Sequence, residues 1–360
     1  MRKYLLPKDG KFYKANLHMH TNISDGRMTI EETKQAFMEK GYSIVAYTDH
    51  EIMVPHNELS DDNFLAITST EISLNSRYDC AFDFVRCYHL NLYSEEPNKD
   101  WYTTFDEKRM WLAQSKPYVT DKQRQNQFNR LYDTSNINEI IKMANEDKCL
   151  VSYNHPVWSC QDYSDYIDLK GLWAVEWFNN GCYLAGYIDT MNPIDELLKK
   201  GERVFPIATD DAHKLEDCFG GFTMIKASDL KYDTIYKALK SGDFYSSTKP
   251  LIHELYFEDG CIHIKTSKVK MIYVSTDSRY KMCKKSDDLI DEAVFDLNHY
   301  FSLNNVNEHK YIRISLIDEF GWEAHTRAYF FDELIKDDII DKEANKIINK
   351  HIEAFKELAK

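Results

Sequence analysis

The sequence predicts an α/β fold: a barrel of alternating strands and helices, then a small β-sandwich-like domain and a C-terminal helix. Three observations support this prediction. Between residues 11 and 249, short apolar runs alternate with helical stretches, as in consecutive βα units. From residue 250 to 331 the segments alternate at strand spacing, with little helical periodicity. The last residues, 332–360, return to helical spacing. The predicted domains are therefore 1–249, 250–331 and 332–360.

The first βα unit shows the clearest local signals. Residues 14–17 form a short predicted strand. Thr29 and Glu32 are spaced as a capping box, in which each side chain accepts a hydrogen bond from the other residue's backbone N–H. Gly41 suits the left-handed position that ends a helix. Residues 43–48 then follow as a buried strand.

Further elements are predicted along the chain from the same signals. The remaining strands of the barrel are 64–68, 85–92, 149–153, 172–177 and 204–208, and its helices are 137–147, 193–200 and 232–240. The strands of the β domain are 252–257, 261–264, 271–274, 311–316 and 324–330. The C-terminal helical stripe, which we expect to pack on the protein itself, comprises Ile340, Ala344, Ile348, Ile352, Phe355 and Leu358.

Composition excludes several classes of protein. The chain has 45 Lys and Arg against 59 Asp and Glu, a formal net charge of −14. Long nucleic acids are therefore not expected as partners, because binding them normally depends on basic side chains. No apolar run approaches about 18 residues, so no membrane span is expected, and the N-terminal apolar stretch is too short for a signal peptide. Eight scattered cysteines without a C-x-x-C pair fit reduced thiols in a cytoplasmic protein.

Side chains that can bind metal ions follow most of the predicted strands. They are His18, His20, Asp25, His50, Glu71, His89, His155, Asp211 and His213. Taken singly, each has an ordinary structural explanation, such as a hydrogen-bonded histidine or a turn aspartate. Taken together they are informative, because the strand ends of a (β/α) barrel converge on one face. His18 and His20 are two residues apart in extended chain, so their side chains point the same way.

The ligand chemistry indicates the kind of ion. Imidazoles and carboxylates without thiolates suit zinc, iron, manganese or similar divalent ions. Nine ligands are too many for one ion, which takes about four to six. The sequence therefore predicts two or three metal ions.

Four segments resemble motifs of the PHP (polymerase and histidinol phosphatase) superfamily of metal-dependent phosphoesterases. In order, they are 16–26 (NLHMHTNISDG), 47–50 (YTDH), 154–156 (NHP) and 209–213 (TDDAH). Glu71 and His89 fall where this family places its remaining ligands. The match covers residues 11–249, and the short format with a trailing β domain resembles the small-molecule phosphatase branch.

The resemblance implies a distorted (β/α)7 barrel with a trinuclear cluster. It implies a first metal held by His18, His20, Glu71 and Asp211, a second held by Glu71, His89 and His155, and a third held by Asp25, His50 and His213. It also implies that Asp49 orients a ligand histidine through the other ring nitrogen. Asp210 competes with Asp211 for its role, and Asp211 is preferred because it keeps the D-x-H spacing.

These features predict hydrolysis of a small phosphorylated metabolite, of the nucleotide or sugar phosphate class, by a metal-activated hydroxide. Three alternatives stay open: an amidohydrolase-type enzyme that cleaves C–N or C–O bonds, a 3′–5′ exonuclease on short oligonucleotides, and a non-catalytic binding protein stabilised by metals. The D-x-H ending and the early Ser-Asp-Gly weigh against the first, and the net charge weighs against the second. Oligomeric state is left open.

Residues outside the motifs bear on the substrate. The aromatics of the long insertion at about 94–132 are candidates for a lid over a base or sugar, although ordinary packing also explains them. Glu51 adds a negative charge beside the predicted site, and His56 is a candidate substrate contact. The candidates for contacting phosphate are Arg77 first, and then Arg109, Arg124 and Arg130 of the insertion.

Overall fold

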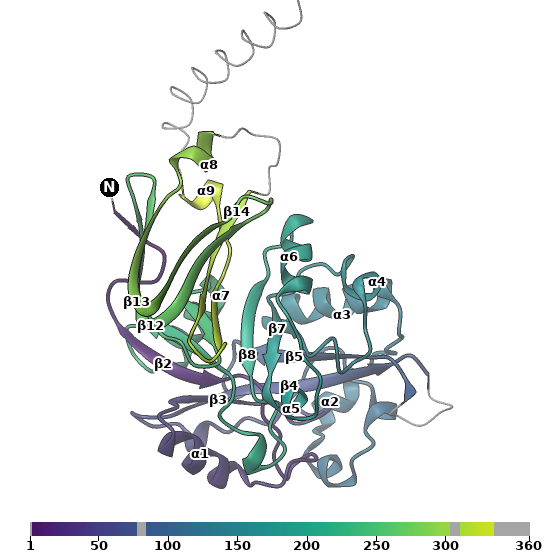
Figure 1. Ribbon diagram of the computed structural model, residues 1–360. Helices are drawn as coiled ribbons and strands as arrows, with labels where there is room; N and C mark the ends of the chain where they lie inside the picture. The colour runs from purple at the N-terminus through teal and green to yellow at the C-terminus, as the bar shows by residue number, and fades with distance from the viewer. Residues whose placement is uncertain (1, 78–83, 303–309, 335–360) are drawn as a thin grey trace, which may run out of the picture. The chain divides into compact units, whose positions relative to one another are not determined.

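The computed structural model describes residues 2–77, 84–302 and 310–334. The described residues divide into two compact units (Figure 1): those between 9 and 249 form the larger one, and those between 2 and 8 and between 250 and 334 form the smaller one. Residues 2–8, which the sequence analysis assigned to the barrel domain, belong to the smaller unit because β1 pairs with β11. The part of the predicted C-terminal helix that follows Leu334 lies outside the described residues. The described residues hold no helix long and apolar enough to cross a membrane.

The larger unit is built on one mixed sheet, in the order β10-β9-β2-β3-β4-β5-β6-β7-β8. The strands are β2 (Lys11–Asn16), β3 (Ile44–Tyr47), β4 (Leu65–Asn75), β5 (Cys87–Ser94), β6 (Cys149–Tyr153), β7 (Ala174–Asn179), β8 (Phe205–Thr209), β9 (Phe222–Ala227) and β10 (Phe244–Ser247). The pairs β2/β3, β3/β4, β6/β7 and β7/β8 are parallel. The pairs β4/β5, β5/β6, β2/β9 and β9/β10 are antiparallel.

The helices of this unit are α1 (Ile30–Glu39), α2 (Asp121–Gln125), α3 (Thr134–Glu146), α4 (Tyr163–Tyr166), α5 (Asn180–Leu184), α6 (Asn192–Lys199) and α7 (Tyr232–Ser241), with 3₁₀ turns at Asn57–Leu59, Glu107–Arg109, Ala113–Tyr118 and Leu215–Asp217. They include those expected from the sequence, which are α1, α3, α6 and α7, together with short ones that were not expected. The predicted capping box of α1 is confirmed, with hydrogen bonds of 3.2 Å and 2.9 Å between Thr29 and Glu32. Gly41, just after α1, has the expected positive φ of 75°.

The α/β class is confirmed, but the predicted series of seven consecutive βα units is not. β4 and β5 are antiparallel neighbours, and such a pair needs no crossover helix. Cα atoms of β8 lie within 8 Å of those of β9 and β10, so the sheet curls back toward its own beginning. The interior is filled by buried apolar side chains from both ends of the sheet, among them Ala15, Ile44, Ile67, Ile207 and Ile225.

The smaller unit is antiparallel throughout its described part. Its strands are β1 (Lys3–Tyr4), β11 (Ile252–Glu258), β12 (Cys261–Thr276), β13 (Met282–Asp296), β14 (Tyr311–Ile317), β15 (Glu323–Thr326) and β16 (Tyr329–Phe330), with short helices α8 (Asn298–Ser302) and α9 (Phe331–Leu334). The long β12 pairs with β11 through its first half and with β14 through its second. These strands form one continuous hydrogen-bonded sheet, and the predicted two-layer sandwich is not confirmed.

Candidate metal centre

Two motif segments that are nearly 200 residues apart in sequence lie side by side. Met19 forms an isolated parallel bridge with Ala212. The backbone N–H of His20 donates to the carbonyl of Ala212 (3.1 Å), and that of Asp211 donates to the carbonyl of His18 (3.0 Å). Because side chains alternate along extended chain, this pairing turns the residues on both sides of Met19 and of Ala212 toward the same face.

A second pairing brings in Glu71. β4 is longer than β3. Its first residues pair with β3, and its residues from Ser69 onward pair with β5. Beyond the end of β3, His50 forms an isolated bridge with Glu71. His89 lies on β5, diagonally across from Glu71. The sheet register thus places one carboxylate between histidines from both neighbouring segments.

The loop that carries Asp25 is closed tightly on itself. A Cβ atom at Gly26 would lie 2.2 Å from the carbonyl oxygen of His20, so only glycine fits there. Non-glycine residues also adopt left-handed backbone at the site, with φ of 49° at Asp211 and 27° at His155. Such conformations cost free energy and often mark functional positions.

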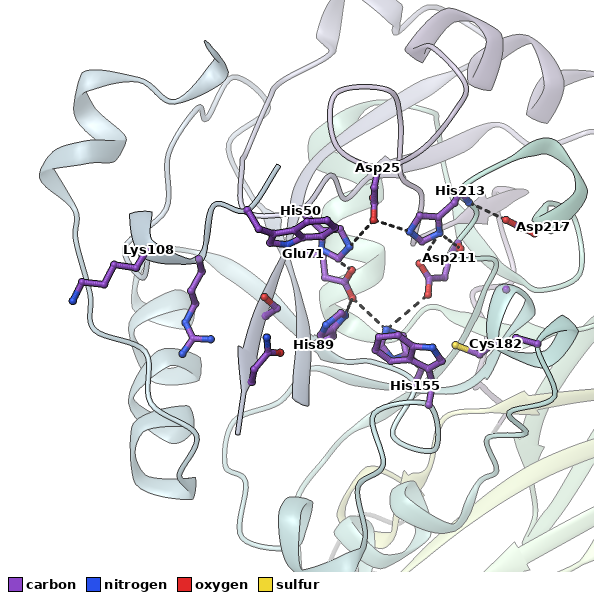
Figure 2. Close-up of a pocket in the computed structure, with 17 residues that line it drawn as sticks. Asp25, His50, Glu71, His89, Lys108, His155, Cys182, Asp211, His213 and Asp217 are labelled. Carbon is purple, nitrogen blue, oxygen red and sulfur yellow. Dashed lines mark hydrogen bonds and ion pairs between the residues drawn. The ribbon is translucent and has the colours of Figure 1, made fainter. Parts of the chain in front are cut away.

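All nine predicted ligands come together beside a cavity of about 620 Å³, whose lining residues are drawn in Figure 2. Seven of them line the cavity, and the other two, His18 and His20, are fully buried. The cavity is large enough for a small-molecule ligand. The remaining lining residues are Ser73, Asn75, Lys108, Arg109, Trp111, Trp158, Gly181, Cys182, Ala185 and Asp217.

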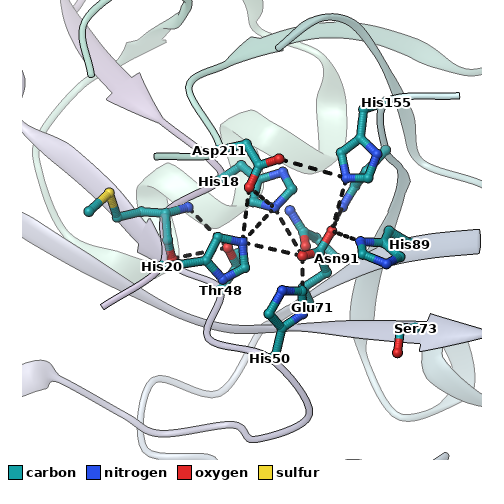
Figure 3. Close-up of polar contacts among 12 residues, drawn as sticks. His18, His20, Thr48, His50, Glu71, Ser73, His89, Asn91, His155 and Asp211 are labelled. Atoms are coloured by element: carbon teal, nitrogen blue, oxygen red, sulfur yellow. Dashed lines mark hydrogen bonds and ion pairs between the residues drawn. The ribbon is translucent and has the colours of Figure 1, made fainter. Parts of the chain in front are cut away.

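Glu71 lies at the centre of the cluster (Figure 3). Its Oε2 is 3.3 Å from Nε2 of both His18 and His20 and 3.4 Å from Nδ1 of His50. Its Oε1 is 3.1 Å from Nδ1 of His89 and 3.4 Å from Nε2 of His155. One carboxylate therefore faces five imidazoles, and its two oxygens are turned toward different sets of them.

Asp211 and Asp25 complete the cluster on either side of His20. Asp211 Oδ1 is 3.2 Å from Nε2 of His18 and 3.0 Å from Nε2 of His20. Asp25 Oδ2 is 3.4 Å from Nε2 of His213, and its Oδ1 is 3.7 Å from Nδ1 of His20. Sets of candidate ligand atoms that lie within 4.8 Å of one another are His18/His20/Glu71/Asp211, Glu71/His89/His155, His20/Asp25/His50/His213 and His18/His155/Glu176.

The donor atoms fit divalent metal ions. With metal–ligand bonds of about 2.1 Å, neighbouring ligand atoms are about 3.0 Å apart in an octahedron and about 3.4 Å apart in a tetrahedron. The separations of 3.0–3.3 Å from Glu71 Oε2 and Asp211 Oδ1 to Nε2 of His18 and His20 match these values. In the described chain, His20 Nδ1, His50 Nδ1 and Asp211 Oδ1 are buried without a hydrogen-bond partner, as expected of atoms meant for an ion.

The pKa values show that the carboxylates are held ionised. Burial opposes ionisation of Glu71 and Asp211, but the charge of His18 and the other histidines lowers the pKa of both carboxyls well below the usual range. Burial lowers the pKa of His20, yet the Asp211 and Glu71 carboxylates outweigh it and raise the value to about 10. Burial and nearby His20 lower the pKa of His50 to about 3, which leaves its lone pair available.

Glu176 is a supporting residue that the sequence analysis missed. It lies in β7 and is fully buried. Its carboxylate accepts hydrogen bonds from Nδ1 of His18 (2.7 Å), Oγ1 of Thr209 (2.7 Å), the backbone N–H of His155 (3.1 Å) and Nδ2 of Asn179 (3.0 Å). It thereby fixes the ring of His18 so that Nε2 faces the cluster. The available signal was an acidic residue inside an otherwise apolar strand.

Two aspartates beside the ligands hold loops. Asp49 was predicted to orient a ligand histidine, but its carboxylate instead accepts hydrogen bonds from the N–H and hydroxyl groups of Thr21 and Ser24, at 2.6–3.2 Å. It therefore fixes the loop of Asp25. Asp210 accepts from the backbone N–H groups of residues 219–221 at 2.8–2.9 Å, while Asp211 faces the cluster.

Of the four arginines that were predicted to contact phosphate, Arg109 lines the cavity and the other three do not. Arg77 is exposed and does not line the cavity, whereas Arg109 does. Arg130 is buried in an ion pair with Glu51, so the negative charge beside His50 is balanced inside the protein. Arg124 forms surface ion pairs with Asp121 and Glu107. An arginine in a sequence gives no sign of which of these environments it will occupy.

Two further details concern His56 and Lys108. His56 is buried against Tyr47, with ring centroids 5.1 Å apart, and does not line the cavity, so it is a packing residue. Lys108, from the insertion, lines the cavity, but its side chain points away from the cluster (Figure 2). The insertion therefore supplies part of the cavity wall.

We expect Arg130→Met to destabilise the larger unit, because it leaves the buried Glu51 carboxylate without its cation; such losses cost about 3–5 kcal/mol. Urea unfolding followed by tryptophan fluorescence measures this, since five of the six tryptophans lie in residues 9–249. The matched control is Arg124→Met, which removes only surface ion pairs and should change little. Equal stability of the two variants would contradict the assigned role of the Glu51–Arg130 pair.

We expect Glu176→Gln to weaken metal binding about 10- to 100-fold, the usual effect of losing a partner that orients a ligand. The change replaces one acceptor oxygen by an N–H₂ that would face hydrogen-bond donors, so the ring of His18 would be held less firmly. Metal affinity is measured by competition with a chelator. Glu216→Gln, an exposed change outside the cavity, is the control, and the same affinity in both variants would rule out this role.

Comparisons with known proteins give matches among solved structures. No family model matches the sequence, and no curated protein matches it. A two-domain protein from Bacteroides vulgatus containing a predicted PHP-like metal-dependent phosphoesterase is 12% identical, with a TM-score of 0.44 over 91% of this chain and 98% of that one.

Two further similar structures match a smaller part of the chain. A lesion-specific endonuclease from Pyrococcus furiosus is 18% identical, with a TM-score of 0.38 over 64% of this chain and 56% of that one. An amidohydrolase from Chromobacterium violaceum is 12% identical, with a TM-score of 0.38 over 64% and 96%. Proteins described as a PHP-like metal-dependent phosphoesterase, an endonuclease and an amidohydrolase are thus all among those to which this chain is similar.

Proposed function

We propose that this protein is a metal-dependent hydrolase of the PHP type, and that it hydrolyses a small phosphomonoester. The observation that supports the proposal most directly is the cluster itself. Six imidazoles and three carboxylates, from segments spread over residues 18–213, lie in overlapping sets of ligand atoms beside one cavity. The four sequence segments that resemble PHP motifs supply seven of these nine side chains.

The sets assign ligands to two or three ions. His18, His20, Glu71 and Asp211 would hold the first, Glu71, His89 and His155 the second, and Asp25, His50 and His213 the third, with His20 close to the third set as well. The mixture of nitrogen and oxygen ligands favours zinc, manganese or iron. Bound divalent ions would supply Lewis-acid chemistry, lowering the pKa of water and neutralising phosphoryl oxygens.

The protein's own residues would position and balance this charge. Glu71 offers one oxygen to each of two sets, so it holds them at a fixed separation. Three cluster carboxylates offset only half of the roughly six positive charges of three divalent ions, so the cavity would be locally positive. An acidic protein can thereby attract an anionic substrate without surface lysine or arginine.

A panel of substrates separates this proposal from its alternatives. Release of phosphate from monoesters is the expected activity. Hydrolysis of amides or carboxylic esters alone would favour the amidohydrolase-type alternative, and stepwise shortening of a labelled oligonucleotide would favour the exonuclease. A protein that binds metal but hydrolyses none of these would be a metal-stabilised binding protein. The same fold can serve all four, so the assay decides rather than the fold.

We expect the purified protein to contain two to three divalent ions per chain and to lose phosphatase activity, by about 100-fold or more, in a His20→Ala variant, because His20 belongs to two ligand sets. Elemental analysis and phosphate release measure the two effects. The control is His253→Ala, an exposed histidine of the smaller unit, which should behave as the unchanged protein. A protein without bound metal at physiological metal concentrations would overturn the proposal.

A further inference from the structure

The cavity wall contains an exposed tryptophan from the insertion. Trp111 is 62% exposed, yet it lines the cavity, and its ring centroid lies 6.0 Å from that of His50. A large aromatic side chain left in solvent beside a reactive site is a feature of ligand-binding surfaces. The ring therefore lies beside the space that a ligand held by the cluster would occupy.

Other parts of the wall are also apolar. The ring of Trp158 lies 5.0 Å from that of His155 and 5.3 Å from that of His89. Cys182 and Ala185 line the cavity as well. At these apolar positions a planar aromatic group matches the indole rings and small apolar side chains better than a sugar does, because a sugar needs polar partners.

A carboxamide is available in the same cavity. Glu71, Ser73 and Asn75 lie on alternate positions of β4, so their side chains share one face of the strand. Asn75 lines the cavity about 13 Å along the strand from Glu71. Its Oδ1 is buried and has no hydrogen-bond partner within the described part of the chain. An Asn carboxamide both donates and accepts, which suits the edge of a nucleobase.

Trp111 is held in place by anchors on both sides. After it, Ser115 Oγ donates to the carbonyl of Ile23 (2.8 Å), and Gln114 donates to the carbonyl of Ser24, so the insertion is fastened to the loop of Asp25. Before it, the hydroxyl of Tyr102 donates to the carbonyl of Glu51 (3.0 Å). The chain segment that carries Trp111 is therefore fastened to the two loops that carry cluster residues.

We propose that this cavity contains a nucleobase subsite, in which Trp111 stacks on the base and Asn75 binds its edge. The inference rests on the proposed function: the phosphate of a nucleoside monophosphate would lie at the cluster while its base reaches the subsite. Stacking on an aromatic side chain is a general means of binding bases. The substrate class is thereby narrowed from phosphomonoesters in general to those that carry a base.

The test uses the metal-loaded full-length protein and two readouts. The first is calorimetric binding of adenosine, which has a base but no phosphate. The second is kcat/KM for adenosine monophosphate and for ribose 5-phosphate, which differ only by the base. The variants are Trp111→Ala, Trp111→Phe and Asn75→Ala. The control is Trp101→Ala, which removes a tryptophan of the same insertion that contacts Lys99 and Lys122 and does not line the cavity.

We expect adenosine to bind the unchanged protein, the control and Trp111→Phe alike. In Trp111→Ala its Kd should rise at least about ten-fold, as expected for loss of one stacking contact. Asn75→Ala should raise it by a smaller factor. For Trp111→Ala, kcat/KM for adenosine monophosphate should fall by a similar ratio, while that for ribose 5-phosphate stays unchanged.

The results of this test distinguish a failure of the nucleobase subsite from a failure of the proposed phosphatase function. Adenosine that fails to bind the unchanged protein, or binds equally well after Trp111→Ala, overturns the subsite even when both phosphomonoesters are hydrolysed. Adenosine that binds through Trp111 in a protein that hydrolyses neither ester supports the subsite and overturns the phosphatase function. Thermal unfolding of Trp111→Ala, which should match that of the unchanged protein because the ring is exposed, shows whether the variant is folded.

Discussion

The placement of Glu71 among five histidines is the constraint on which the rest of the larger unit depends. A buried carboxylate without cations close by is costly, and so is a buried imidazolium without anions. The carboxylates of the cluster are therefore stable only when the histidines are in position, and the histidines only when the carboxylates are. The isolated bridges Met19–Ala212 and His50–Glu71 meet this requirement with the backbone, because they fix the register of four segments from which the side chains project. Metal ions in place of protons would satisfy the same balance of charge.

Around the cluster, buried carboxylates outside the nine predicted ligands hold the segments that carry those ligands. Asp49 fastens the loop of Asp25, Asp210 fastens residues 219–221, and Glu176 joins His18 to the start of the loop at His155. Each accepts three or more hydrogen bonds from neutral donors or from an imidazole, which is how a carboxylate is accommodated in a protein interior. The consecutive residues Asp210 and Asp211 show this difference between supporting and ligand carboxylates most clearly. Their side chains point to different sides, so Asp210 holds the loop of residues 219–221 and Asp211 faces the cluster.

Features of this chain that depend on short-range spacing could be predicted from the sequence. The two-residue spacing of His18 and His20 sets their common direction, and Thr29 with Glu32 sets the start of α1. The gathering of the nine ligands was also predictable, because they follow successive strands, but roles outside the motifs that depend on which segments meet were not. Glu176 acquires its role only when β7 lies beside His18, and Arg130 only when the insertion reaches Glu51. The antiparallel β4/β5 pair likewise depends on a long-range choice of partners that local propensity does not encode.

The two parts of the cavity are fixed by different kinds of contact, and this has consequences for how its specificity can vary. The ligands are set by backbone pairing at strand ends, which tolerates little change. The insertion is attached through side chains: Arg130 to Glu51 and Ser115 to the carbonyl of Ile23. Its exposed face, with Trp111, contributes to the wall but not to these attachments. Substitutions on that face can therefore alter what fits beside the cluster while leaving the cluster intact, whereas substitutions at the attachments would displace the loops of His50 and Asp25. Chemistry and selectivity are thus assigned to separate sets of residues within one cavity.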